Sequence, residues 1–147
     1  MRTFKFGREP RIPFSIEALK ASLARLQDEW EAVQASRDRN AIYQYLAAVF
    51  ELVTWWEHDQ QAIKCAYRAL HLQRRKAVRE PEPFAAVILC TADPDKADER
   101  TRSKWSRALR YAAEYKDLKE ALPDFIKRKG GINECAARFG RRLGRLS

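Results

Sequence analysis

The chain has 147 residues and a net charge of +9, with 46% hydrophobic and 11% aromatic residues. This composition excludes an intrinsically disordered chain, and five glycines and six prolines are few for an all-β or loop-rich protein. The longest apolar stretch, from Phe84 to Cys90, is too short to span a bilayer. Because the N-terminus also lacks the apolar segment of a signal peptide, we expect a cytoplasmic protein that has no contact with a membrane.

The positive charge is distributed unevenly along the chain. Residues 100–147 contain 14 of the 29 basic residues but only 5 of the 20 acidic ones, so this last third carries the whole surplus. An asymmetry of this kind is typical of proteins with a polyanionic partner. A solvated basic face that aids solubility is the alternative interpretation of the same count.

Cysteine and histidine are sparse. Cys65, Cys90 and Cys135 lie far apart with no C-x-x-C pair, so we expect free thiols that serve mostly as small apolar core residues. His58 and His71 are the only histidines, and they do not converge with Cys65 at the spacing of a zinc site. The sequence therefore predicts no metal and no cofactor.

The N-terminal part of the chain predicts an arm followed by a helical core. Residues 1–13 contain a glycine and two prolines and predict an extended arm, in which the alternation at Phe4 and Phe6 allows a short strand. Residues 14–80 contain neither glycine nor proline, which favours helix throughout. Ser15 is the expected cap of the first helix, and Phe14 can pack onto Leu19 as a hydrophobic staple.

The first helix carries a narrow apolar stripe whose members are three or four residues apart. The stripe consists of Ile16, Leu19, Leu23, Leu26, Trp30 and Val33. Such a seam favours packing on the next helix of the same chain, and a homodimer is the alternative.

A polar break at Ser36–Asn40 separates this helix from a second one that starts near Asn40. The second helix has a broad stripe, which indicates a central position. The stripe consists of Ile42, Leu46, Val49, Val53 and Trp56. The apolar period continues beyond Gln61, and we expect a break with Asp59 as the cap of a third helix, in preference to one long helix that reaches Ala77.

Trp55 and Trp56 are adjacent on the second helix. Neighbouring helical residues diverge by about 100°, so one ring is expected in the core and the other partly exposed. An exposed tryptophan is a candidate anchor for a protein partner, and two core rings are the alternative.

Residues 83–147 predict a second, basic helical part that packs on the core. A helix from Pro83 to Ile88 is favoured over a buried strand, which would have no partner. Asp93 before Pro94 predicts a helix that ends near Lys116. A short helix then begins at Pro123, and a last helix runs over residues 132–142 with a loosening at Gly140.

The expected helix after Asp93 carries a basic face. Arg100, Lys104 and Arg107 share this face at spacings of four and three residues, and Arg102 and Arg110 flank it. Cations on one helical face can contact successive phosphates. Trp105 and Tyr111 can stack on bases if they are exposed, and the alternative is a core Trp105 beneath a solvated basic face.

The segment over residues 123–145 resembles the front of a helix-turn-helix unit. The resemblance rests on Phe125-Ile126, Gly130-Gly131-Ile132, Ala136-Ala137 and Phe139-Gly140. It implies a group of phosphate contacts, namely Lys127, Arg128, Lys129, Arg138, Arg141, Arg142 and Arg145. Because the residues after Gly140 are too few for a recognition helix, either residues 132–139 form the reading helix or another element completes the site.

These observations predict an all-α helical bundle. No phosphate-binding glycine loop and no nucleophile elbow occurs. The leading hypothesis is a non-enzymatic nucleic-acid-binding protein, either a small regulator or a helical subunit of a nucleoprotein complex. The alternatives are an interaction module or inhibitor that docks an acidic protein, and an enzyme without a recognisable motif. Exposed rings of Trp105 and Tyr111 on a continuous basic face favour the first hypothesis. Burial of both rings, together with an exposed apolar seam elsewhere, favours the second.

Overall fold

The computed structural model describes residues 15–76 and 78–146, and for residues 143–146 the backbone alone. These residues form seven α-helices and no strand, which confirms the all-α class. The helices are α1 (Ile16–Ala35), α2 (Ala41–His58), α3 (Ala62–Leu72), α4 (Pro83–Thr91), α5 (Glu99–Tyr115), α6 (Leu122–Arg128) and α7 (Ile132–Leu146). The expected arm over residues 1–13 and the staple by Phe14 lie outside the described residues.

Helix α1 packs against the next helices of its own chain. The Ser15 hydroxyl caps it by accepting a hydrogen bond from the amide of Ala18 at 3.1 Å. The central residues of its apolar stripe are buried, and α1 contacts α2, α3 and α4. This is the intramolecular packing that the spacing of the stripe favours.

Helices α2 and α3 are separated by a short turn, so the prediction of a break after Trp56 is correct. The expected cap is wrong, because Asp59 ends α2 instead of starting α3. Gln60 has a φ of 60°, and the amide of Gln61 returns to the carbonyl of Trp56 at 2.8 Å. The turn thus provides hydrogen bonds to the last carbonyl groups of α2. Helix α3 then ends at Leu72, well before Ala77.

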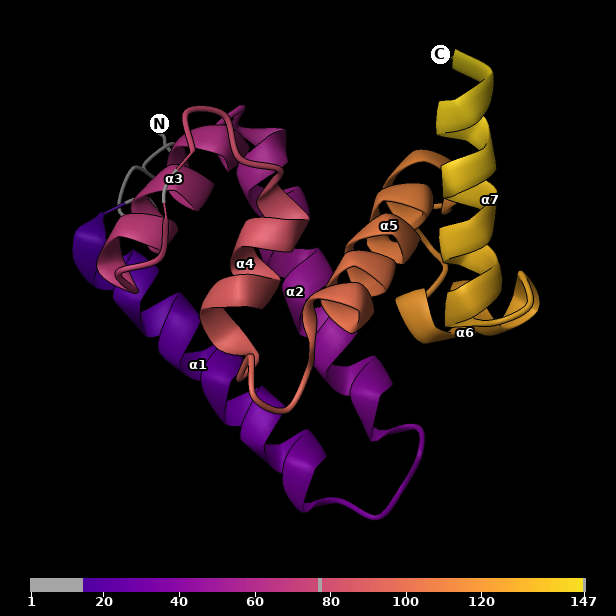
Figure 1. Cartoon of the computed structure of the whole chain (residues 1–147), viewed down its shortest axis with the longest axis horizontal. Helices are drawn as coiled ribbons and strands as arrows, with labels where there is room; N and C mark the ends of the chain where they lie inside the picture. Colours follow the sequence, from indigo (N-terminus) through magenta and orange to yellow (C-terminus); the bar gives the residue numbers. More distant parts are fainter. Residues whose placement is uncertain (1–14, 77, 147) are drawn as a thin grey trace.

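Helix α4 is the short apolar segment for which helix was favoured over strand. The Glu82 carboxylate caps it by accepting from the amide of Ala85 at 2.8 Å. Apart from Ala85, its residues are buried or half-buried, and it contacts α1, α2, α3 and α5. Figure 1 shows α4 between α1 and α5, with α7 on the far side of α5.

Helix α5 begins five residues later than the sequence indicates. Asp98 caps it by accepting from the amide of Thr101 at 2.9 Å. Asp93 instead accepts from the amide of Asp95 and closes a turn that ends at the buried Ala97. Both aspartates are good caps, and the turn places Ala97 in the core before the helix starts.

Helices α6 and α7 are joined by Gly130 and Gly131, whose φ angles are 106° and 105°. The amide of Gly131 returns to the carbonyl of Ile126 at 2.8 Å and ends α6. The loosening expected at Gly140 does not occur, because α7 continues through this residue to Leu146. Glycine is tolerated inside a helix at a modest cost, and packing on α5 offsets that cost. Helices α5 and α7 lie side by side in Figure 1.

The three cysteines belong to three different helices. Cys65, Cys90 and Cys135 are all buried core residues with free thiols, as their separation in the sequence indicates.

Candidate nucleic-acid interface

Helix α7 contacts α5 through a narrow apolar side. The side consists of Cys135, Ala136 and Phe139. Successive helical residues point about 100° apart, so the neighbours of Phe139 lie on opposite flanks of the contact. On one flank, Arg107 Nη1 is 3.7 Å from the place that a Cβ on Gly140 would take. On the other, Arg138 Nη1 donates to the Tyr111 hydroxyl at 3.5 Å. Helix α7 therefore separates the predicted basic residues into distinct groups.

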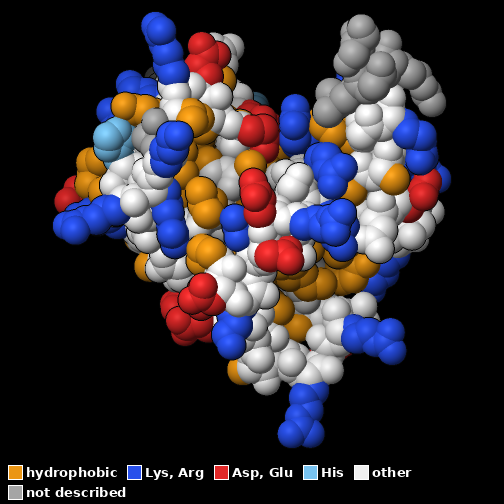
Figure 2. Space-filling view, viewed as in Figure 1, with side chains coloured by type: hydrophobic (Ala, Val, Ile, Leu, Met, Phe, Trp, Pro, Cys, Tyr) orange, Lys and Arg blue, Asp and Glu red, His pale blue; other side chains and the backbone are white. Residues whose placement is uncertain are grey.

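The first group lies on α5. Arg100 is exposed, whereas Lys104 and Arg107 are half-buried, and Arg107 Nε donates to the carbonyl of Ser103 at 3.3 Å. Figure 2 shows lysine and arginine side chains over α5 and along its border with α7, next to acidic side chains. The predicted face is thus only partly open to a ligand.

The two flanking arginines of α5 are held by local contacts. Arg102 donates to the carbonyl of Ala97. Arg110 lies 4.6 Å from the ring centre of Phe139 and 3.9 Å from a carboxylate oxygen of Glu82. Arg102 therefore contacts the turn before α5, and Arg110 contacts α7 and the residue that caps α4.

The two aromatic residues of the predicted basic face are buried. Trp105 and Tyr111 are each 8% exposed. Trp105 meets the rings of Trp30 and Tyr45 edge to face, with ring centres 5.8 and 6.3 Å apart. The exposure on which base stacking by these two rings depends is therefore absent, because both rings pack into the core.

A second group of cations lies at the end of α6. Lys127 sits over the ring of Tyr43 at 5.1 Å, and Lys129 over that of Phe125 at 5.9 Å. Arg128 makes a two-point ion pair with Glu120, with distances of 2.9 and 2.7 Å. Within the described part of the chain, no hydrogen bond or ion pair joins these three to the arginines of α7, and the side chain of Arg145 lies outside that part.

The third group forms a site. Three arginines of α7 surround two tyrosines of α5 in a surface hollow of about 370 Å³, which we name the Arg–Tyr hollow. Its lining residues are Tyr111, Tyr115, Arg138, Arg141 and Arg142. All three arginines were predicted from the sequence as phosphate contacts, but only the packing of α7 on α5 brings them to the same hollow.

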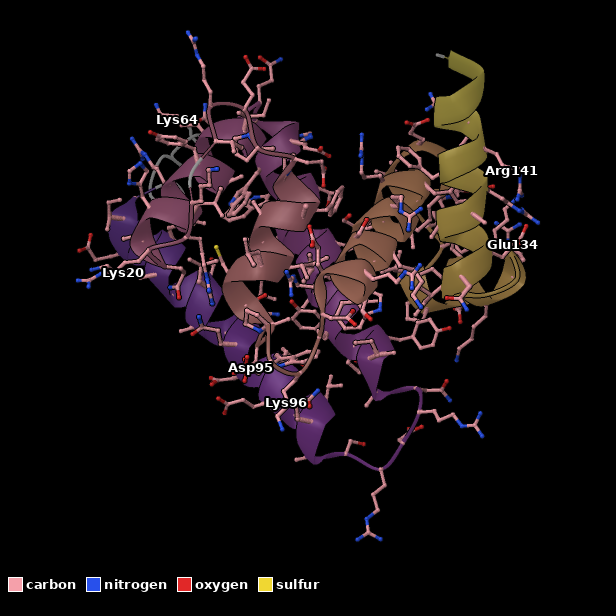
Figure 3. The ribbon with its side chains drawn as sticks, in the orientation of Figure 1. Lys20, Lys64, Asp95, Lys96, Glu134 and Arg141 are labelled. Atoms are coloured by element: carbon pink, nitrogen blue, oxygen red, sulfur yellow. The ribbon has the colours of Figure 1, made fainter. Side chains whose placement is uncertain are left out.

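Two glutamates border the hollow and hold its arginines in position. Glu134 accepts from Arg138 at 2.8 Å and from Arg141 at 3.3 Å, and Glu114 pairs with Arg142 at 2.9 Å. The hydrogen bond from Arg138 is the main reason that the pKa of Glu134 lies below its usual range. Glu134 and Arg141 lie on the side of α7 that faces away from α5 (Figure 3).

The arginines of the hollow retain hydrogen-bond donors. Each guanidinium group has five N–H donors. Within the described residues, Arg141 and Arg142 each use only Nη2 in a contact, and Arg138 uses Nε and Nη1. Their side chains are 56%, 35% and 38% exposed respectively. An incoming anion can therefore reach donors that the glutamates do not occupy.

Tyr115 is the residue of this site that the sequence did not identify as functional. Its ring is 52% exposed and lies against the buried ring of Tyr111, with centres 4.8 Å apart and planes inclined by 41°. The four-residue spacing of the two tyrosines was a usable signal, because it places them on one face of a helix. The spacing indicates a site only in combination with the arginines of α7, which line the same hollow as the two tyrosines.

The adjacent tryptophans divide as expected. Trp56 is 1% exposed in the core, whereas Trp55 is 46% exposed. Trp55 borders a groove of about 480 Å³ between α1 and α2. The groove is lined by Ala21, Ser22, Arg25, Leu26, Ala48, Glu51, Leu52 and Trp55.

No family model matches this chain, and no curated protein or solved structure shows significant similarity to it. Among the helices described, none is both long enough and apolar enough to cross a membrane. Within the same residues, no cluster of three histidine, cysteine or acidic side chains is arranged to hold a metal ion.

Proposed function

We propose that this protein is a non-enzymatic nucleic-acid-binding protein, a small regulator or a helical subunit of a nucleoprotein complex, whose contact surface is centred on the Arg–Tyr hollow. The observation that carries the proposal is the gathering of Arg138, Arg141 and Arg142 around Tyr111 and Tyr115. Arginine and tyrosine are the side chains that bind phosphate groups and stack on bases.

The chemistry of guanidinium groups supports phosphate as the anion. A planar guanidinium group offers parallel N–H donors that match two phosphate oxygens, and it keeps its charge at any physiological pH. The ion pairs with Glu114 and Glu134 restrict the arginines before a ligand arrives, although the same carboxylates also compete with an incoming anion. Preorganised side chains lose less conformational entropy on binding.

The charge of the wider surface supports the same proposal. Three arginines and two glutamates leave the hollow itself with a surplus of one positive charge. Residues 100–147 as a whole have a surplus of nine, which attracts a polyanion and raises its rate of association. Affinity is then expected to come from released counterions as well as from direct contacts.

A salt titration with matched variants tests this proposal. Wild-type protein should bind both single-stranded and duplex oligonucleotides at low ionic strength. Its affinity should fall steeply with salt: the logarithm of the association constant should drop by about 0.7–0.9 per phosphate contact for each tenfold increase in salt concentration. The variant Arg138→Gln/Arg141→Gln/Arg142→Gln should lose most of the binding. The variant Arg100→Gln/Lys104→Gln/Arg107→Gln removes the same charge and should lose less.

The outcomes of this titration separate three interpretations. If the α5 variant loses most of the binding instead, the predicted face of Arg100, Lys104 and Arg107 is the contact surface. If wild-type protein binds no nucleic acid at low ionic strength, the proposal is wrong. Both variants should keep the melting temperature of the wild type, since exposed ion pairs contribute little to stability.

A second candidate function is docking of an acidic protein, and the half-exposed Trp55 beside the α1–α2 groove favours it. The burial of Trp105 and Tyr111 also agrees with this alternative. Poly-glutamate is a suitable probe. If it binds as tightly as an oligonucleotide at the same salt concentration, the basic surface recognises charge alone and the alternative is favoured.

A further inference from the structure

The size of the Arg–Tyr hollow limits what can enter it. Its volume of about 370 Å³ lies at the lower end of the range for small-molecule pockets, which is about 300–1,000 Å³. A duplex cannot enter such a space, whereas a single nucleotide of a strand can. Its size therefore matches a single nucleotide better than a base pair.

Tyr115 provides a fixed aromatic surface at this hollow. Its ring is 52% exposed and contacts the ring of Tyr111, whose plane is inclined to it by 41°. Tyr111 is itself fixed by the ring of Phe125 at 5.9 Å and by the guanidinium group of Arg138. A supported ring loses little entropy when a base stacks on it. In a duplex both faces of each base are covered by its neighbours, so only an unpaired base offers a free face.

The arginines of α7 provide cations at the same hollow as the Tyr115 ring. Arg138, Arg141 and Arg142 are four or fewer residues apart on one helix, and all three line the same hollow as Tyr115. Each retains N–H donors that its contacts with the glutamates and Tyr111 do not use. Stacking and phosphate binding can therefore act on one nucleotide and its neighbours at the same time.

We infer that the Arg–Tyr hollow holds one nucleotide of a single strand, with its base stacked on Tyr115 and its flanking phosphates bound by Arg138, Arg141 and Arg142. The inference rests on the proposed nucleic-acid-binding function and adds a preference for single-stranded over duplex ligands. It also assigns Tyr115 as the base-contacting residue, because Trp105 and Tyr111 are buried.

The test is to measure the binding of Tyr115→Ala to a fluorescent oligothymidine strand and to a duplex of the same length, at one low salt concentration. The single-strand affinity should fall on the order of tenfold, whereas duplex affinity should stay within about twofold of the wild-type value. Tyr67→Ala is the matched control, because Tyr67 on α3 is another partly exposed tyrosine, at 39%. It should leave both affinities unchanged.

Two further variants keep the test decisive. Tyr115→Phe retains the ring and should bind like the wild type. Tyr115→Leu retains apolar bulk without an aromatic face and should behave like Tyr115→Ala, which covers the case in which the alanine variant folds poorly. Melting temperatures of all variants are compared with that of the wild type.

The failures can be told apart. If Tyr115→Ala and Tyr115→Leu bind the single strand as tightly as the wild type, the inference is overturned while the proposed function stands. If wild-type protein prefers the duplex, the inference is also overturned, and the helix-turn-helix interpretation of residues 123–145 becomes the better account. If wild-type protein binds neither probe, the proposed function itself is wrong.

Discussion

Helix α5 has an aromatic cluster near each end, and the two clusters differ in what surrounds them. In its first half, Trp105 forms a three-ring cluster with Trp30 of α1 and Tyr45 of α2. At its end, Tyr111 and Tyr115 face the arginines of α7. Trp105 and Tyr111 are equally buried, and only the ring of Tyr115, in the last position of α5, is largely exposed. The same helical spacing thus yields packing at one end and a candidate site at the other.

Removing the first cluster should have the largest effect. Trp105→Ala deletes a buried ring and should lower the free energy of unfolding by about 3–5 kcal/mol, because the surrounding helices can fill the space only partly. Tyr115→Ala should lower it by less than about 1 kcal/mol. Urea denaturation monitored by circular dichroism measures both. Equal stability losses would show that the two ends of α5 do not differ in the way that the structure indicates.

The orientation of α7 on α5 should depend on the glycine turn. Gly131 has a φ of 105°, and no atom lies within 4 Å of the place that a Cβ would take, so Gly131→Ala tests backbone conformation alone. It should lower the free energy of unfolding by about 1–2 kcal/mol.

Gly140→Ala is the opposite case, because its nearest neighbour is the flexible Arg107 at 3.7 Å. It should stabilise α7 by about 0.5–1 kcal/mol. A destabilised Gly140→Ala would contradict the continuous helix.

The smallest expected effect concerns the charge at the second cluster. Glu134→Gln removes a carboxylate that competes with phosphate for Arg138 and Arg141, so nucleic-acid affinity should rise severalfold. The slope of log K against log salt should become steeper by less than the value expected for one phosphate contact. Glu17→Gln is the control, because Glu17 also lies in the first turn of a helix but on α1. A rise of equal size in both variants would mean that net charge matters and the position of Glu134 does not.

Local signals in the sequence were sufficient for most of the helices. Ser15, Pro83 and the Gly130-Gly131 pair mark helix ends by backbone preferences that act over a few residues. Asp93 and Asp98 are equally good caps, and only the burial of Ala97 in the intervening turn decides between them. Gly140 was misleading because a glycine inside a helix and one that ends it look alike in a sequence.

The candidate site was less accessible to such signals. Arg138, Arg141 and Arg142 are recognisable as basic residues, but their common position depends on how α7 crosses α5, at a separation of some thirty residues. The exposure of Trp105 and Tyr115 depends on which other helices cover α5, and no spacing within α5 reveals that. Contacts between distant segments therefore determined which of the predicted residues form a site.

The buried cysteines allow the opening of each part of the molecule to be timed separately. Cys65, Cys90 and Cys135 lie in α3, α4 and α7, and burial raises the pKa of all three thiols, that of Cys90 to about 12. A buried neutral thiol reacts with an alkylating reagent only while its surroundings are open. At a reagent concentration high enough for alkylation to outpace reclosing, mass spectrometry of the labelled peptides thus gives three opening rates from the unaltered protein. Equal rates would indicate cooperative unfolding of the whole bundle, whereas faster labelling of Cys135 would show that α7 detaches while α3 and α4 remain folded.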